Sequence, residues 1–215
     1  MCYTRFIERI ERIFVFGDSF ADNVRINKKS GYILQEHLHL IWSEKIKNFL
    51  KPKKYFNYGA CATGPTHTIN EIKKINFTEN DLVIVILSFH DVDNDKLFDI
   101  NLKNQNFIHN LSAKTIVMHV HYDEKLCHPF TFPLSLYDIS MNEIYSSLSE
   151  IQVRRWDKRI NHLSWCNHEI LFNCVIKMLD GFNDFYYDMF DFKFLNVDEA
   201  YHPDLYNSNI KFIYD

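Results

Sequence analysis

Short apolar runs separated by amphipathic segments occupy most of the chain up to residue 120. Residues 13–16 (IFVF) and 82–87 (LVIVIL) are continuous apolar runs, the pattern of strands that are buried on both faces of a sheet. Residues 55–60 (YFNYGA) and 115–120 (TIVMHV) are two further runs of strand character. We therefore predict four strands.

Helical spacing appears between and after these runs. Residues 41–50 (IWSEKIKNFL) place their apolar side chains on one helical face before Pro52. A second helix is predicted around residues 65–75, and a third between Ser164 as N-cap and Gly181 at the end. Strands that alternate with helices at this spacing predict βαβ units, and hence a parallel sheet with helices on both faces.

The rest of the chain has a weaker pattern. Residues 122–155 contain two prolines and several aromatic residues, and we expect a long loop with a short helix there. Residues 182–215 are aromatic and acidic, too apolar for a disordered linker. We predict one α/β domain over residues 1–181, with 182–215 as a C-terminal extension packed on the same domain.

Composition narrows the class of protein. The net charge of −4 gives no electrostatic footprint for a phosphate backbone, so nucleic acid is not expected as a main partner. Five cysteines without CxxC spacing indicate neither a disulfide framework nor a zinc knuckle. The sequence shows no secretory signal and no apolar stretch of membrane-spanning length. We therefore expect a cytoplasmic protein with reduced thiols and no metal.

Three polar stretches directly follow predicted strands. Ser19, residues 57–62 and residues 88–91 each lie just past a strand end, and the carboxyl ends of parallel strands share one rim where sites form. Ser19 comes after Gly17 and Asp18 in the run RIFVFGDS. Such a serine is either a nucleophile on a tight turn or a helix N-cap.

The order of these motifs resembles that of the SGNH or GDSL hydrolases. The resemblance covers roughly residues 12–180 and rests on five features in order: Gly17-Asp18-Ser19-Phe20 after a strand, a helix that begins at Trp42, the stretch Asn57 to Gly64, a strand led by Asp81, and His162-Leu163-Ser164 before a helix. It implies a three-layer α/β/α, flavodoxin-like fold with a central parallel sheet. It also implies an ester hydrolase that works through a Ser-His dyad or triad without a cofactor.

The resemblance assigns roles to residues of the first three motifs. Ser19 is the nucleophile, and the backbone N–H groups of Ser19 and Ala62 bind the oxyanion. Ala62 stands where the family has a glycine, and His90 stands where it has an asparagine that donates to the oxyanion. An imidazole can donate one N–H, so His90 is either a third donor or a structural residue.

The general base has two candidates. His162 precedes the last predicted helix, but the family's orienting aspartate position, three residues earlier, holds Arg159. Asp157 is then the carboxylate that orients His162, or the base works in a dyad. His202, with Glu199 three residues before it, is the alternative base.

Three functions remain open from the sequence. The first is a serine esterase or acylesterase whose substrate is a small-molecule or glycan ester such as a glycan O-acetyl group, acting by hydrolysis or by acyl transfer. The second is a catalytically impaired domain that binds glycan or assembles with other proteins, including in a virus particle. The third is a metal hydrolase built on His119 and His121 with His128 or Asp123, although such histidines at a strand end more commonly form a polar rim.

Overall fold

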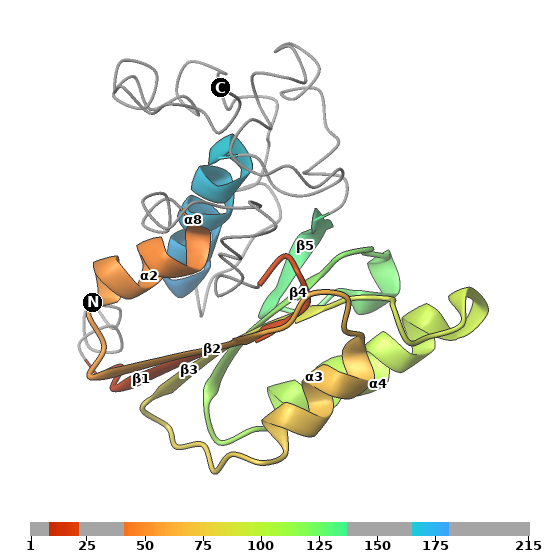
Figure 1. Ribbon diagram of the computed structural model, residues 1–215, viewed down its shortest axis with the longest axis horizontal. Helices are drawn as coiled ribbons and strands as arrows, with labels where there is room; N and C mark the ends of the chain where they lie inside the picture. The colour runs from red at the N-terminus through yellow and green to blue at the C-terminus, as the bar shows by residue number, and fades with distance from the viewer. Residues whose placement is uncertain (1–8, 22–40, 137–164, 181–215) are drawn as a thin grey trace, which may run out of the picture.

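The computed structural model describes residues 9–21, 41–136 and 165–180. These residues contain a five-stranded parallel sheet with the strand order β2-β1-β3-β4-β5 (Figure 1). The strands are β1 (Arg12–Gly17), β2 (Lys54–Gly59), β3 (Asp81–Leu87), β4 (Lys114–His119) and β5 (Thr131–Ser135).

Helices cover both faces of the sheet. α2 (Trp42–Leu50) and α8 (Trp165–Asp180) lie on one face, and α3 (Pro65–Ile72) and α4 (Leu97–His109) lie on the other (Figure 1). Two 3-10 turns complete the described elements, η2 (Asn94–Lys96) and η3 (Glu124–Leu126). This three-layer α/β/α arrangement confirms the fold class that the sequence predicted.

The central strand β3 shows how the layers are joined. Leu82, Ile84 and Ile86 face the cluster beneath α2 and α8, while Val83 and Val85 face the cluster beneath α3 and α4. All of them are fully buried, and each buried side chain of this size stabilises the fold by roughly 1.5–3 kcal/mol. Burial on both faces explains why this strand reads as an unbroken apolar run.

The predicted elements appear close to their expected positions, but two others were missed. The strand β5 lies where we expected a loop; it contains Pro133, which cannot donate to a ladder, and its register with β4 shifts between Val117 and His119. The helix α4 buries Asn101 and Gln105 on its inner face. These polar residues interrupt the apolar stripe that marks a helix in a sequence.

The helix α2 ends as its sequence predicted. Lys51 adopts a left-handed conformation with φ of 48°, and its N–H donates to the carbonyl of Lys47 over 2.9 Å. Pro52 follows and prevents the helix from continuing. The extension at residues 182–215 lies outside the described residues, so the division of the chain at residue 181 stays a prediction.

The strand direction separates the molecule into two ends. In Figure 1 the amino ends of β1 and β2 lie at the left, and the turns that follow the strands lie toward the right. Ser19 therefore belongs to one rim, while the turn from α2 into β2 belongs to the opposite one. Within residues 9–21, 41–136 and 165–180, no helix is long and apolar enough to cross a membrane.

Candidate active site

The turn that carries Ser19 is shaped by the residues before it. Gly17 has φ of +146°, and a Cβ there would lie 2.8 Å from the Cβ of Ile86 on the neighbouring strand, so a side chain does not fit. Asp18 then closes the turn, because its Oδ1 accepts the N–H of Phe20 over 3.0 Å. Ser19 itself is 7% exposed.

Donors from other parts of the chain fix this turn from the outside. Each of them binds a backbone carbonyl in or beside the turn, so the position of Ser19 is set by several elements at once. The three bonds run from Ala60 N–H to Gly17 (2.9 Å), from the Trp42 indole N–H to Phe20 (3.0 Å), and from the Asn57 side-chain amide to Ala21 (2.9 Å).

Ala62 lies in the second turn of the rim with φ of 59°, in the left-handed region. A residue with a Cβ is disfavoured there by roughly 1–2 kcal/mol, and glycine is not. Thr63 holds the conformation, since its hydroxyl donates to the carbonyl of Ala60 over 2.6 Å. Ser88, from the rim after β3, donates to the carbonyl of Thr63 over 2.8 Å. Ala62 thus keeps the backbone conformation expected of a glycine at this position.

Gly64 and Asp91 pack the second turn of the rim against the third turn, which follows β3. A Cβ on Gly64 would overlap the Asp91 carboxylate, at 1.9 Å from its Oδ1. The other oxygen of Asp91 accepts the N–H of Thr66 in the first turn of α3 over 3.1 Å. A carboxylate at a helix N-terminus satisfies a backbone donor and complements the helix dipole. The absence of a side chain at residue 64 therefore lets the third turn cap α3.

His90 reaches from the third turn to the Ser19 turn. Its Nε2 lies 3.8 Å from Oδ2 of Asp18, whose side chain is fully buried, whereas that of His90 is 36% exposed. The distance is too long for a hydrogen bond but short enough for a direct electrostatic contact. The ring also lies against Phe89, with 4.5 Å between centroids. The structure therefore brings His90 beside the residue that precedes the candidate nucleophile.

Trp42 connects the Ser19 turn to α8. Its indole donates to Phe20, and its backbone N–H donates to Nδ1 of the buried His168 over 3.3 Å. This N–H belongs to the first turn of α2 and has no partner within its own helix. His168 therefore caps α2 from another element and brings the start of α8 to the Ser19 side of the sheet.

The predicted site residues divide into two groups. The turns that carry Ser19, Ala62 and His90 lie at one rim and are joined by the bonds described above. The candidate bases His162 and His202 and their carboxylates, Asp157 and Glu199, lie outside the described residues, so their roles stay predictions.

His119, the last residue of β4, and His121, two residues after it, make contacts of other kinds. His119 is fully buried, and its Nε2 lies 2.8 Å from Oε1 of Gln105 in α4. Burial lowers the pKa of His119 to about 3, with a smaller contribution from the charge of His109. His121 instead lies against Phe89, with ring centroids 5.0 Å apart. Across the described ranges, no group of three or more His, Cys, Asp and Glu side chains could hold a metal ion.

Sequence reasoning missed the structural roles of Trp42, Asn57 and Asp91. Trp42 and Asn57 belong to the motif order that gives the family resemblance, but their bonds to the Ser19 turn come from other parts of the chain and leave no local pattern. Asp91 caps α3 from 25 positions farther along the chain, so its role leaves no local pattern either.

Solved structures with a similar fold include an esterase, an α/β-hydrolase enzyme and a lipolytic protein. A protein of the G-D-S-L lipolytic family from Desulfitobacterium hafniense DCB-2 superimposes with a TM-score of 0.50 at 11% identity, over 78% of this chain and 98% of the other. An α/β-hydrolase enzyme from the metagenome of Lake Arreo, Spain, gives 0.50 at 12% identity, over 80% and 96%. A two-domain esterase active on acetylated mannans gives 0.50 at 12% identity, over 83% and 52%.

No protein-family model matches the sequence, and no curated protein sequence matches it. The structural matches show that the chain has the α/β fold of the SGNH hydrolases, as the order of its motifs predicted. At this level of identity the relationship is one of fold.

Proposed function

We propose that this protein is a serine esterase of the SGNH type, with Ser19 as nucleophile and His162 as general base. The observation that carries the proposal is the double contact of Trp42. It ties the turn of Ser19 to His168 in the first turn of α8, and His162 lies three residues before Trp165, where α8 begins. Three residues span at most about 10 Å, so the position of α8 limits where His162 can lie, and the proposal is that it lies within reach of the Ser19 hydroxyl.

The reaction follows from these roles. The Ser19 hydroxyl attacks the ester carbonyl and gives its proton to His162. The carbonyl carbon becomes tetrahedral, bonded to the Ser19 oxygen, and its own oxygen becomes the oxyanion. Collapse of this intermediate breaks the bond to the alcohol, which takes the proton from His162 as it leaves. Water then attacks the acyl-serine, again with His162 as base, and releases the acid and free Ser19. Asp157 orients His162 in this scheme.

The oxyanion is stabilised by the backbone N–H groups of Ser19 and Ala62 and by the ring N–H of His90. The left-handed conformation of Ala62 supports its part, because it is the conformation that the glycine of this motif adopts without strain. The position of His90 beside Asp18, next to the turn of Ser19, supports the third donor, because an imidazole ring can donate one N–H.

The substrate that we propose is an O-acyl ester on a glycan. A structure with this fold is an esterase active on acetylated mannans, and the similarity in fold makes an O-acetyl sugar the first substrate to test. Acyl transfer to a second alcohol uses the same acyl-serine and differs only in what attacks it.

A second candidate function is a catalytically impaired domain that binds glycan or assembles with other proteins. The observation that favours it is the histidine at position 90, where the family has a neutral amide donor, together with the alanine at position 62. The loss of one oxyanion donor typically costs a hundredfold or more in turnover. Such a protein would bind an acetylated glycan without releasing acetate.

Hydrolysis of a short-chain nitrophenyl ester separates these functions. We expect the wild type to turn over the ester, Ser19→Ala to lose all activity above background, and His162→Ala to lose at least a thousandfold in kcat. His202→Ala serves as the matched control and should retain activity. A folded wild type without activity would favour the binding domain, and activity that survives Ser19→Ala but not a chelator would indicate a metal hydrolase.

A further inference from the structure

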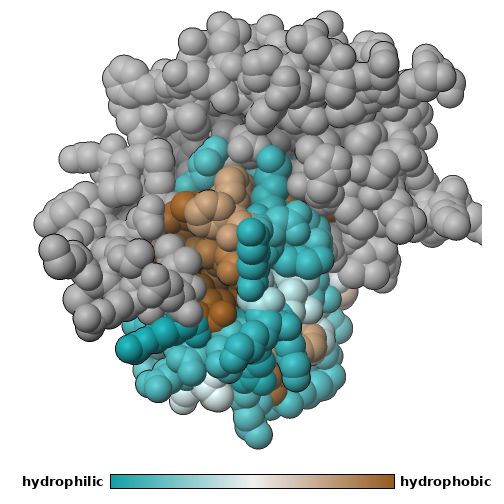
Figure 2. All heavy atoms as spheres, turned by 90° about the vertical axis from the view of Figure 1, so that its left-hand side faces the viewer, coloured by the Kyte–Doolittle hydropathy of each residue, from teal (hydrophilic) through white to brown (hydrophobic). Residues whose placement is uncertain are grey.

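The end of the molecule opposite Ser19 carries a concentration of lysines. Residues 45–54 (KIKNFLKPKK) contain five lysines and no acidic residue, in a chain whose net charge is −4. They form the second half of α2 and the turn into β2, at the amino ends of the strands. The described surface seen from this side is largely hydrophilic around an apolar area (Figure 2). The charge therefore stands out against an acidic protein.

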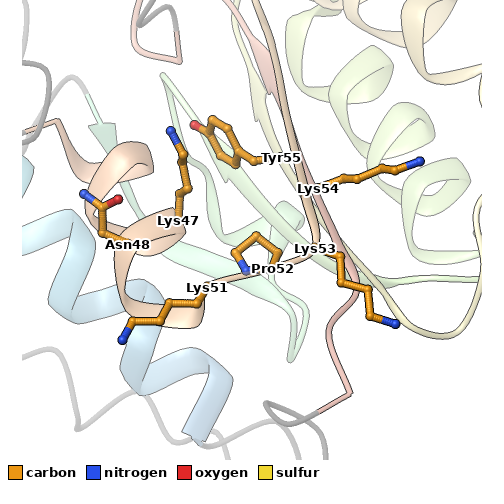
Figure 3. Close-up of a pocket in the computed structure, with 7 residues that line it drawn as sticks. All are labelled: Lys47, Asn48, Lys51, Pro52, Lys53, Lys54 and Tyr55. Atoms are coloured by element: carbon orange, nitrogen blue, oxygen red, sulfur yellow. The ribbon is translucent and has the colours of Figure 1, made fainter.

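A hollow of about 500 Å³ lies within this lysine surface, in the range of small-ligand sites. Its lining residues come from the end of α2, the turn and the first residues of β2: Lys47, Asn48, Lys51, Pro52, Lys53, Lys54 and Tyr55. Figure 3 shows the Pro52 ring in the middle of this set, with the lysine side chains extending outward around it.

The lysines of the hollow differ in whether a carboxylate lies beside them. Lys47 lies 2.9 Å from Glu44, and Lys53 lies 2.7 Å from Glu11. Lys51 and Lys54 are exposed, and neither has a carboxylate partner among the residues that the structure describes. Among the described residues, Lys51 and Lys54 thus supply the two ammonium groups of the hollow that no carboxylate offsets, whereas the charges of Lys47 and Lys53 are offset by Glu44 and Glu11.

The directions of the side chains indicate the shape of that anion. The ammonium groups of Lys51, Lys53 and Lys54 point to different sides of the hollow rather than toward one point (Figure 3). A compact anion such as phosphate needs converging donors, whereas a linear polymer meets successive charges along its length. The divergent ammonium groups of these lysines fit a linear polyanion.

The residue types indicate the class of polymer. The hollow has no arginine, the residue favoured for bidentate contacts with phosphate. Its one aromatic ring, that of Tyr55, has the Lys47 ammonium 5.2 Å from its centroid, so this face is not an open stacking platform for a base. We propose that this surface binds an acidic polysaccharide through its carboxylate or sulfate groups. This proposal does not depend on Ser19 being a nucleophile.

Binding of polygalacturonate and heparin tests this inference, with polygalacturonate supplying carboxylates and heparin sulfates. The full chain should bind at least one of the two in low salt, and about 0.3 M NaCl should abolish the binding because exposed charges are screened. The variant K51Q/K54Q should weaken binding about tenfold. The control K103Q/K125Q removes the same charge from exposed lysines elsewhere and should stay within about twofold. Neutral mannan should not bind through these lysines.

Other outcomes overturn the proposal. Equal weakening in both variants would show a response to net charge only, and no binding in low salt would exclude the site. Tighter binding of a single-stranded oligonucleotide, lost in K51Q/K54Q, would assign the surface to nucleic acid instead. Turnover of the nitrophenyl ester should be the same in wild type and K51Q/K54Q, so the result is independent of the proposed catalysis.

Discussion

Trp42 donates its backbone N–H to Nδ1 of His168 over 3.3 Å, across 126 positions of sequence. The same residue donates its indole N–H to Phe20, next to the candidate nucleophile. One fully buried residue, through its backbone N–H and its indole N–H, therefore links the start of α8 to the turn of Ser19. The proposed catalytic pair depends on this link, because Ser19 and His162 come from segments far apart in the chain.

Trp42→Phe tests the link. The substitution keeps a large apolar side chain but removes the donor to the carbonyl of Phe20. We expect the free energy of unfolding to fall by about 1–2 kcal/mol and kcat for ester hydrolysis to fall about tenfold, with KM less affected. Denaturant unfolding and steady-state kinetics measure the two effects. Unchanged kcat in a folded variant would contradict the positioning role.

Ala62 offers a test of the second turn. Ala62→Gly relieves the left-handed conformation and should keep both stability and activity close to those of the wild type. Ala62→Val is the matched variant, because a β-branched residue is strongly disfavoured at φ of 59°; it should lower the free energy of unfolding by about 1–2 kcal/mol and reduce kcat. If Ala62→Val had the kcat and KM of the wild type, the turn of Ala62 would not be part of the oxyanion site.

Substitutions of His90 test whether it is an oxyanion donor or a structural residue. His90→Asn restores an amide donor, and we expect its kcat to stay within about tenfold of the wild type. His90→Ala has no donor, and its kcat should fall about a hundredfold or more. His121→Ala is the control, since it lies on the ring of Phe89 as His90 does. Equal kcat in His90→Asn and His90→Ala would leave His90 with a structural role only.

The sequence predicts those elements of the fold in which all residues follow one pattern of burial. The strand 82–87 is apolar throughout because both of its faces are covered, and the motif order after each strand end placed three site segments on one rim. The helix α4 and the strand β5 were missed because Gln105 and Pro133 break their patterns. Gln105 is a buried polar residue whose partner, His119, comes from another element, and a bond of this kind has no local signature.

The buried histidines predict sensitivity to acid. Burial lowers the pKa of His109 and of His119 to about 3, from the ordinary value of 6.5, with smaller contributions from the charges of His128 and of His109, respectively. The unfolded chain therefore binds protons that the folded chain does not. The stabilisation is complete above pH 6.5 and declines as the pH falls toward 3, by about 1.4 kcal/mol per pH unit for each histidine.

The variant His119→Gln isolates one of these groups. It keeps an amide that can pair with Gln105 but does not titrate. The free energy of unfolding is measured with urea at several pH values between 6.5 and 5. Its slope against pH should be smaller in the variant, by the equivalent of about one bound proton. The same pH dependence in both proteins would contradict the assignment.

The central claim is that Ser19 is the nucleophile, and a covalent adduct tests it most directly. The folded protein is treated with a fluorophosphonate, digested, and examined by mass spectrometry for the modified peptide. We predict one phosphonate on Ser19 in the wild type and none in Ser19→Ala. Labelling of a different residue, or no labelling of wild-type protein that binds an acetylated glycan, would contradict the account.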